Sequence, residues 1–239
     1  MRWHMIEGMD GCRYAREYGH TAVIVDALRA SCTAAMLLDA GATEITLVPD
    51  VDTALKFKTA NPDALLFGER NGLPPEGFDY GNSPREVAAA KGKSIGFTTS
   101  NGTALMIEAF GAPEVYMASV TNGMVLVQQV MALDRDAVLI LAGNVSDPEF
   151  SAQEDWVAAS AMVMLTDIEV GEGITAFREW RHMISLDGVA KLFDTAPHSD
   201  ALRAIGLGED IRFCARPNLT TALPRAVGRS EFGIQLTSA

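Results

Sequence analysis

The stretch Thr21-Ala22-Val23-Ile24-Val25-Asp26 decides the fold of this chain. An apolar, mostly β-branched run that stops at a carboxylate is typical of a strand that is buried in a sheet and ends at a polar edge. Ser31 or Thr33 can cap a helix over 34–40, and Gly41 is suited to end it. A buried strand followed at once by a helix is the repeating unit of α/β proteins.

The same alternation continues along the chain. Strands are predicted at 44–48, 64–67, 95–98, 114–118 and 137–142, and helices at 51–59, 85–90, 104–110, 122–133 and 151–165. Beyond residue 167 the pattern weakens, and helices are predicted at 175–184, 189–195 and 199–205. Because strands separated by helices usually pair in parallel, we expect an α/β fold with a largely parallel sheet flanked by helices in three layers. A single unit over 1–239 is predicted, and two α/β subdomains divided near 120–150 are the alternative.

The amino-acid composition of the chain limits which partners and which cellular location we expect. The 239 residues carry a net charge of −12, and no cluster of Lys or Arg offers the basic surface that a nucleic-acid backbone requires, so we expect no nucleic-acid partner. No apolar run approaches the ~18 residues of a membrane span, and the first residues lack the apolar core of a signal peptide, so a cytoplasmic location is predicted. Cys12, Cys32 and Cys214 follow neither metal-binding nor disulfide spacing.

Polar clusters follow four of the predicted strands. They comprise Asp26, Arg29, Ser31 and Thr33; Glu69, Arg70 and Asn71; Thr98, Thr99, Ser100, Asn101 and Thr103; and Gly143, Asn144, Ser146 and Asp147. In open α/β sheets ligands bind at the carboxyl ends of the strands, so we expect these clusters to meet in one pocket. The long Gly- and Pro-rich loop 69–84 belongs to the second cluster, and loops of this length are often functional.

The chemistry of these clusters suits a phosphate ester. Hydroxyls and amides at a helix start can bind an oxyanion, which the helix dipole also favours. Arg29 and Arg70 can bind such oxygens in a bidentate manner. Asp26 and Glu69 are the hard oxygen ligands that Mg²⁺ takes together with water and substrate oxygens. A cation of this kind would offset the repulsion between the carboxylates and an anionic substrate.

Each cluster also has a plain structural interpretation. Asp26 can cap the next helix, 98–103 can be a turn with an N-cap, and Asn71-Gly72 is a common turn pair. The loop 69–84 can be a lid or an interface. Glu154 and Asp155 open an apolar helix, where they either balance the helix dipole or bind a metal.

The histidines are scattered along the chain without metal-ligand spacing, and we expect surface or hydrogen-bonding roles for His4, His20, His182 and His198. His20 precedes the first core strand and so lies at the end opposite Asp26. We therefore expect no site shared between these two residues.

Four segments carry a likeness to a known family. They read Val25-Asp26-Ala27-Leu28-Arg29-Ala30-Ser31; Gly68-Glu69-Arg70-Asn71-Gly72 continuing to Phe78-Asp79-Tyr80-Gly81-Asn82-Ser83-Pro84; Thr98-Thr99-Ser100-Asn101-Gly102-Thr103; and Phe150-Ser151 to Glu154-Asp155. In order and spacing they resemble the 2-phosphosulfolactate phosphatase (ComB) family over about 21–165. Cys32 departs from the family pattern, which usually has Ser or Thr there.

The resemblance implies a ComB-like fold and Mg²⁺-dependent hydrolysis of (R)-2-phospho-3-sulfolactate to 3-sulfolactate and phosphate, a step of coenzyme M biosynthesis in some archaea. From the resemblance together with the chemistry of the clusters, we predict catalytic roles for Asp26, Arg29 and Glu69, and Mg²⁺ ligands at Asp26 and Glu69 with Asp155 as a third carboxylate. The implied substrate-binding residues are Ser31, Arg70, Asn82, Thr98, Thr99, Asn101, Gly102 and Thr103. The nucleophile stays open between water and a carboxylate such as Asp26, and a homo-oligomeric state stays open too. The alternatives are a phosphatase of another small phosphorylated acid and a catalytically silent anion-binding protein.

Overall fold

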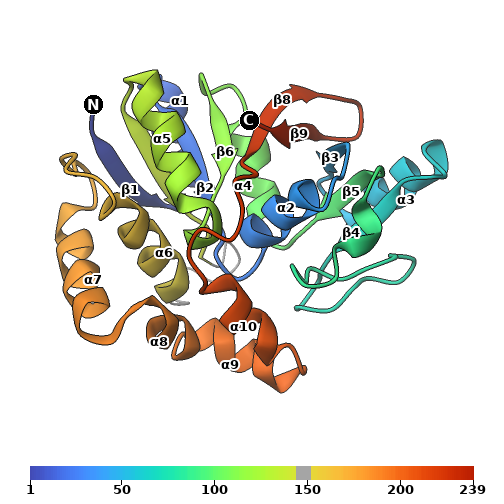
Figure 1. Ribbon diagram of the computed structural model, residues 1–239. Coiled ribbons are helices and arrows are strands. Elements are labelled where there is room, and N and C mark those ends of the chain that lie inside the picture. The colour runs from blue at the N-terminus through green and yellow to red at the C-terminus, as the bar shows by residue number, and fades with distance from the viewer. Residues whose placement is uncertain (144–151) are drawn as a thin grey trace.

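The computed structural model describes residues 1–143 and 152–239. These residues form one nine-stranded sheet with the order β1-β7-β2-β6-β8-β9-β3-β5-β4 (Figure 1). Its strands are β1 Trp3–Glu7, β2 Thr21–Val25, β3 Glu44–Leu47, β4 Leu65–Gly68, β5 Ser94–Thr98, β6 Val115–Met117, β7 Ala137–Leu141, β8 Pro224–Arg229 and β9 Ile234–Ser238. Its α-helices are α1 Gly8–Glu17, α2 Ala30–Asp39, α3 Val51–Ala60, α4 Gly102–Ala109, α5 Gly123–Leu133, α6 Gln153–Val163, α7 Ile174–Asp187, α8 Val189–Asp194, α9 Pro197–Ala204 and α10 Gly208–Cys214.

The sheet contains two parallel groups joined by an antiparallel hairpin. Strands β1, β7, β2 and β6 pair in parallel, and so do β3, β5 and β4. The β8–β9 hairpin lies between the groups, antiparallel to β6 on one side and to β3 on the other (Figure 1). The predicted α/β fold with a largely parallel sheet is therefore confirmed, with two antiparallel strands at its centre.

The twist of the sheet explains how two oppositely directed groups share one site. Three antiparallel pairings separate β6 from β3, so the groups would point in opposite directions in a flat sheet. Neighbouring strands rotate by roughly 20–25°, which accumulates to roughly 120–150° over the six steps from β2 to β4. A rotation of this size would bring the strand directions of the two groups to within about 30–60° of each other, so that their carboxyl ends lie on one side of the molecule.

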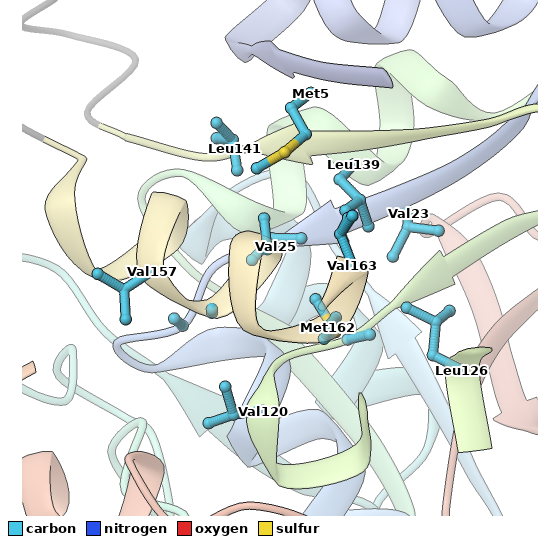
Figure 2. Close-up of a cluster of buried hydrophobic side chains, with 14 of the residues drawn as sticks. Met5, Val23, Val25, Val120, Leu126, Leu139, Leu141, Val157, Met162 and Val163 are labelled. Carbon is cyan, nitrogen blue, oxygen red and sulfur yellow. The ribbon is translucent and has the colours of Figure 1, made fainter. Parts of the chain in front are cut away.

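Helices cover both faces of the first group, as the all-apolar β2 requires. Val23 and Val25 point into a core cluster with α5 and α6, which Figure 2 shows together with Leu139, Val157 and Met162. The alternate residues Ala22 and Ile24 face a second cluster that includes α1, α2 and α4. Because α2 and α4 each connect a strand of one group to a strand of the other, they bind the two groups together.

Several elements differ from the prediction. The helix expected at 85–90 is wrong, because only a 3₁₀ turn forms at Ala88–Ala90 and the hydroxyl of Ser83 binds Asp210. The sequence patterns also missed β1, α1, α10, β8 and β9. The other predicted elements lie within a few residues of their observed bounds, although the helix expected at 151–165 begins outside the described residues.

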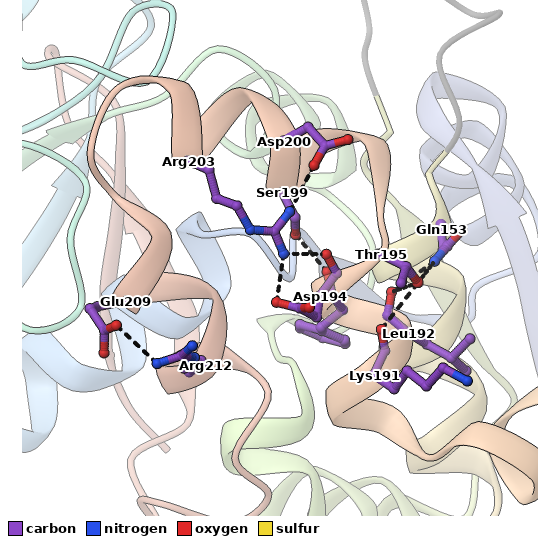
Figure 3. A network of polar contacts seen from close by, with 11 residues as sticks. Gln153, Lys191, Leu192, Asp194, Thr195, Ser199, Asp200, Arg203, Glu209 and Arg212 are labelled. Carbon is purple, nitrogen blue, oxygen red and sulfur yellow. Dashed lines mark hydrogen bonds and ion pairs between the residues drawn. The ribbon is translucent and has the colours of Figure 1, made fainter.

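The helices α7 to α10 close the carboxyl end of the first strand group. Arg203 binds Asp194 and Asp200, and the Gln153 amide donates to the Leu192 carbonyl, so polar pairs hold α8 and α9 against α6 (Figure 3).

None of the helices in the described ranges is long and apolar enough to cross a membrane.

Candidate active site

A cleft of about 350 Å³ opens where β2, β4 and β5 end. Its polar wall consists of Asp26, Arg29, Glu69, Asn71, Asn82, Ser100, Asn101 and His198. Its remaining lining includes Leu28, Ala201, Leu202 and Ile205, which form an apolar wall, and the backbone of Gly72 and Gly143. The cleft thus joins residues of the first three predicted polar clusters and Gly143 of the fourth with the C-terminal helix α9.

Asp26 lies at the starts of two helices. Its Oδ1 accepts from the Ala30 amide of α2 at 3.1 Å, and its Oδ2 accepts from the Gly102 amide of α4 at 3.1 Å. A Cβ on residue 102 would lie 2.8 Å from Oδ2, which explains the glycine at this position. Burial raises the pKa of Asp26 to about 6, and the negative charges of Glu69 and Glu154 add to the shift. The predicted capping role is therefore real, and the same carboxylate lines the cleft.

Glu69 connects the loop after β4 with the loop after β5. Its Oε1 accepts from the Ser100 amide at 2.7 Å, and its Oε2 accepts from the Gly72 amide at 2.9 Å. The backbone of Glu69 also follows β5, because its amide donates to the Thr98 carbonyl. The carboxylate therefore fixes two loops that line the cleft.

Asp155 lies behind the cleft and does not line it. Its two oxygens accept from the amides of Ala27 and Gly143, each at 2.8 Å, so it fixes the chain at the ends of β2 and β7. Burial raises the pKa of Asp155 well above its ordinary value, and the charges of Glu154 and Asp26 act in the same direction. Because Asp155 does not line the cleft, it is less well placed than Asp26 or Glu69 for its predicted role as a Mg²⁺ ligand.

Arg29 lines the cleft, but its guanidinium is already engaged. Nη1 donates to Asp210 at 2.7 Å and Nη2 donates to the Gly72 carbonyl at 2.9 Å. Both side chains of the ion pair are almost fully buried, at 2% and 0% exposure. Asp210 also accepts from the Ser83 hydroxyl at 2.8 Å. The pair connects α2, the long loop 69–84 and α10.

The predicted substrate-binding residues fall into two groups. Asn82 and Asn101 line the cleft, and the Gly102 amide reaches it through Asp26. The others stabilise its surroundings: Ser31 donates to the Ile24 carbonyl, Thr99 and Thr103 cap each other, and Arg70 donates to the Thr98 hydroxyl. Asn144, Ser146 and Asp147 of the fourth cluster lie outside the described residues, and Cys32 is buried in the core beside α10.

His198 is the main residue of the cleft that the sequence interpretation missed. Its Nδ1 lies 3.1 Å from Oε1 of Glu154, while the second oxygen of this buried carboxylate has no hydrogen-bond partner among the described residues. Burial alone would lower the pKa of His198, but the hydrogen bond and charge of Glu154 raise it. No local pattern announced this residue, because α9 reaches the cleft only through the packing of the whole C-terminal region.

The charges in and behind the cleft suit a bound cation. Asp26, Glu69, Glu154 and Asp155 are all buried, whereas the charge of Arg29 is balanced by Asp210. Such an excess of buried oxygen ligands fits Mg²⁺, which takes one or two carboxylates and completes its shell with water and substrate oxygens. The oxygens of Asp26, Glu69 and Asp155 do not all gather within 4.8 Å of one another, so direct binding by all three would require movement.

Comparison with known proteins places this chain in a family. Residues 10–229 match the family described as 2-phosphosulpholactate phosphatase. The chain is 34% identical over 217 residues to the probable 2-phosphosulfolactate phosphatase of Symbiobacterium thermophilum, covering 86% of this chain and 91% of that protein. It is 29% identical over 233 residues to the protein of the same description from Clostridium acetobutylicum, covering 94% and 97%. With a cleft built from the residues that carry the likeness, this chain belongs to the 2-phosphosulpholactate phosphatase family of phosphoric monoester hydrolases.

Proposed function

We propose that the chain is a Mg²⁺-dependent phosphatase that hydrolyses (R)-2-phospho-3-sulfolactate to 3-sulfolactate and phosphate. The observation that carries the proposal is the buried Asp26, which lies at the starts of α2 and α4 and lines the cleft with Glu69. Helix starts favour anions, and an excess of carboxylates favours a cation, so the cleft suits a metal and a phosphate together. The cytoplasmic location and the place in coenzyme M biosynthesis stay predictions.

In the proposed reaction, different residues hold the metal, fix the chain and donate a proton. Asp26 and Glu69 would hold Mg²⁺, and Asp155 would fix the chain behind them. The bound ion would neutralise the phosphoryl oxygens and orient the ester. Attack by water forms a new bond to phosphorus and breaks the bond between phosphorus and the substrate's C2 oxygen, so the attacking water loses a proton and the C2 oxygen gains one. If a carboxylate such as Asp26 attacks instead, an acyl phosphate forms, and a water molecule must then hydrolyse it to release phosphate. His198 lines the cleft and, because Glu154 raises its pKa, is suited to donate that proton.

The first test is phosphate release from (R)-2-phospho-3-sulfolactate. We expect activity with Mg²⁺, loss of activity in EDTA and recovery when Mg²⁺ is restored. Asp26→Ala should lose at least a hundredfold in kcat/KM, while Asp52→Ala, which removes an exposed carboxylate of α3, should retain the wild-type value. Full activity in EDTA or in Asp26→Ala would contradict the proposal.

The second test concerns His198. If it protonates the leaving oxygen, His198→Gln should reduce kcat strongly for an alkyl phosphate and only weakly for p-nitrophenyl phosphate, whose leaving group needs no proton. An equal reduction for both substrates would assign His198 a purely structural role. Circular dichroism of the variant controls for folding.

The apolar wall favours a second candidate, a phosphatase of a less highly charged phosphorylated acid. Leu28, Leu202 and Ile205 line the cleft, and its cationic lining is limited to Arg29 and His198 in the described residues. Segment 144–151 supplies no Lys, Arg or His by sequence. A substrate with a sulfonate and a carboxylate beside its phosphate therefore meets few positive partners. Comparison of kcat/KM for 2-phospho-3-sulfolactate and 2-phospholactate decides, since a tenfold preference for the former supports the first candidate and equal or higher activity on the latter supports the second.

A further inference from the structure

A separate polar cluster lies at the amino ends of three neighbouring strands. His4 is the second residue of β1, His20 directly precedes β2, and Asp136 directly precedes β7. These strands are adjacent in the order β1-β7-β2, so the three residues meet on the side of the sheet where these strands begin. The six residue-to-residue steps from His20 to Asp26 run along β2 and span about 20 Å, so this cluster is distinct from the cleft.

The three side chains form a compact group of possible metal ligands. One ligand atom from each lies within 4.8 Å of the other two, and within the described part of the chain this is the one group of three or more His, Cys, Asp or Glu residues that does so. The rings of His4 and His20 stack with centroids 5.2 Å apart. Nε2 of His4 lies 3.7 Å from Oδ2 of Asp136, which is too far for a hydrogen bond.

His4 has a buried polar atom that no hydrogen bond satisfies. Its side chain is only 8% exposed, yet Nε2 has no hydrogen-bond partner among the described residues. Buried polar nitrogens in native proteins are almost always paired, and each exception requires an explanation. This nitrogen is directed to the space that Asp136 and His20 also border.

Two hydrogen bonds fix the position of Asp136 beside His4. The Arg2 amide donates to its Oδ1 at 2.7 Å, which leaves Oδ2 toward His4. Its backbone carbonyl accepts from the Thr21 amide, so its position is tied to the start of β2. Burial and the nearby His4 lower the pKa of His20, while Asp136 acts in the opposite direction.

We propose that His4, His20 and Asp136 form a second metal site, which takes a borderline divalent transition-metal ion such as Zn²⁺. Two imidazoles and one carboxylate, with a remaining position for water, suit this class of ion and distinguish it from the oxygen-only cleft. Bonds of about 2.1 Å place tetrahedral ligands about 3.4 Å apart, so the half-buried side chains of His20 and Asp136 must rotate inward to complete the site.

Binding has a specific chemical consequence at His4. Its Nδ1 accepts from the Glu172 amide at 3.2 Å, so the ring carries its proton on Nε2 in the metal-free state. A metal on Nε2 requires the proton to move to Nδ1, which ends the Glu172 hydrogen bond. The Glu172 amide must then turn away from the ring, because two N–H donors cannot face each other. The tautomer of His4 therefore reports directly on occupancy.

The ion would fasten the outer strand β1 to β7 and β2. Zn²⁺ should consequently raise the Tm of the wild-type chain, because the assembled site binds it more tightly than the unfolded chain does. The site lies away from the cleft, so its role is structural and separable from hydrolysis.

The experiment is a Zn²⁺ titration of EDTA-treated and desalted protein against a chromophoric chelator, with excess Mg²⁺ present to occupy the cleft. We expect one Zn²⁺ per chain, with affinity reduced at least tenfold in His20→Ala and in Asp136→Asn. His182→Ala, which removes an exposed histidine of α7, and His198→Ala, which removes the histidine of the cleft, should bind like the wild type. Circular dichroism establishes that each variant is folded.

Nitrogen-15 NMR of the wild-type imidazoles provides the second readout. We expect His4 to change from the Nε2-protonated to the Nδ1-protonated tautomer when Zn²⁺ is added. The proposal is overturned if the wild type takes up no Zn²⁺, if His20→Ala and Asp136→Asn bind as well as the wild type, or if the His4 tautomer is unchanged at full occupancy.

Discussion

Asp26 lines the cleft with a buried carboxyl group, and the ionised form of this group makes the folded state less stable. Its carboxyl pKa rises from 3.8 to about 6 because the group is buried, so the folded chain holds the proton more tightly than the unfolded chain does. For an acid with a raised pKa, stability is lost as pH rises between these two values. The raised pKa values of Asp155 and His198 act in the same direction.

We therefore expect Asp26 to make the metal-free chain less stable at pH 7 than at pH 5, by about 1 kcal/mol through this one group. Asp26→Asn removes the titration, so its loss of stability between these pH values should be smaller by that amount. Urea unfolding in EDTA at both pH values measures the difference. Identical pH dependence in the two proteins would contradict the assigned pKa.

The Arg29–Asp210 pair is the second feature that acts at the scale of single residues. Asp210→Asn would leave the buried guanidinium without a counter-charge, and loss of one partner of a buried pair typically costs about 3–5 kcal/mol. The matched control is Glu209→Gln on the same helix, where the exposed pair with Arg212 contributes about 0–1 kcal/mol (Figure 3). Urea unfolding of the two variants should separate them clearly, and similar losses would show that the buried pair has no special role.

The β8–β9 hairpin is the element on which the union of the two strand groups depends. Gly233 lies in its turn, and a Cβ there would come within 1.9 Å of the Leu47 carbonyl oxygen. We expect Gly233→Ala to destabilise the chain by about 3 kcal/mol, because backbone atoms of β3 must move. Gly208→Ala, at the start of α10, meets only Arg203 Cγ at 3.4 Å and should change stability by less than about 1 kcal/mol. Equal Tm values for the two variants would refute the tight contact.

The same hairpin shows where prediction from sequence ends. β2 and β7 were found because buried parallel strands are continuous apolar runs. β8 reads Pro-Arg-Ala-Val-Gly-Arg and is largely half-exposed, so no alternation marks it. Its pairing depends on the distant edges of β6 and β3, which a local pattern cannot contain.

At the scale of the whole molecule, the continuous sheet and the crossing helices α2 and α4 predict cooperative unfolding. Calorimetry should give a single transition in which the calorimetric and van't Hoff enthalpies agree. Two resolved transitions would instead favour subdomains divided near 120–150. The single unit over 1–239 stays a prediction until this measurement.

Part of the cleft could be predicted from the sequence. Asp26, Glu69, Asn82 and Asn101 were found because polar residues after parallel strands converge at one end of a sheet. His198 and Asp210 were missed because short amphipathic helices carry no sign of the place where they pack. Chain topology thus reveals the strand side of the cleft, and only tertiary packing reveals the helical side.

The position of the hairpin in the chain also affects biosynthesis. Strands β8 and β9 are translated after all the other described strands, so a nascent chain passes through a stage in which the facing edges of β6 and β3 are both open. Open edges pair readily with other chains. A ribosome that pauses before residue 224 would leave both edges exposed, so the time taken to translate segment 224–238 sets how long these edges stay open to pairing with other chains.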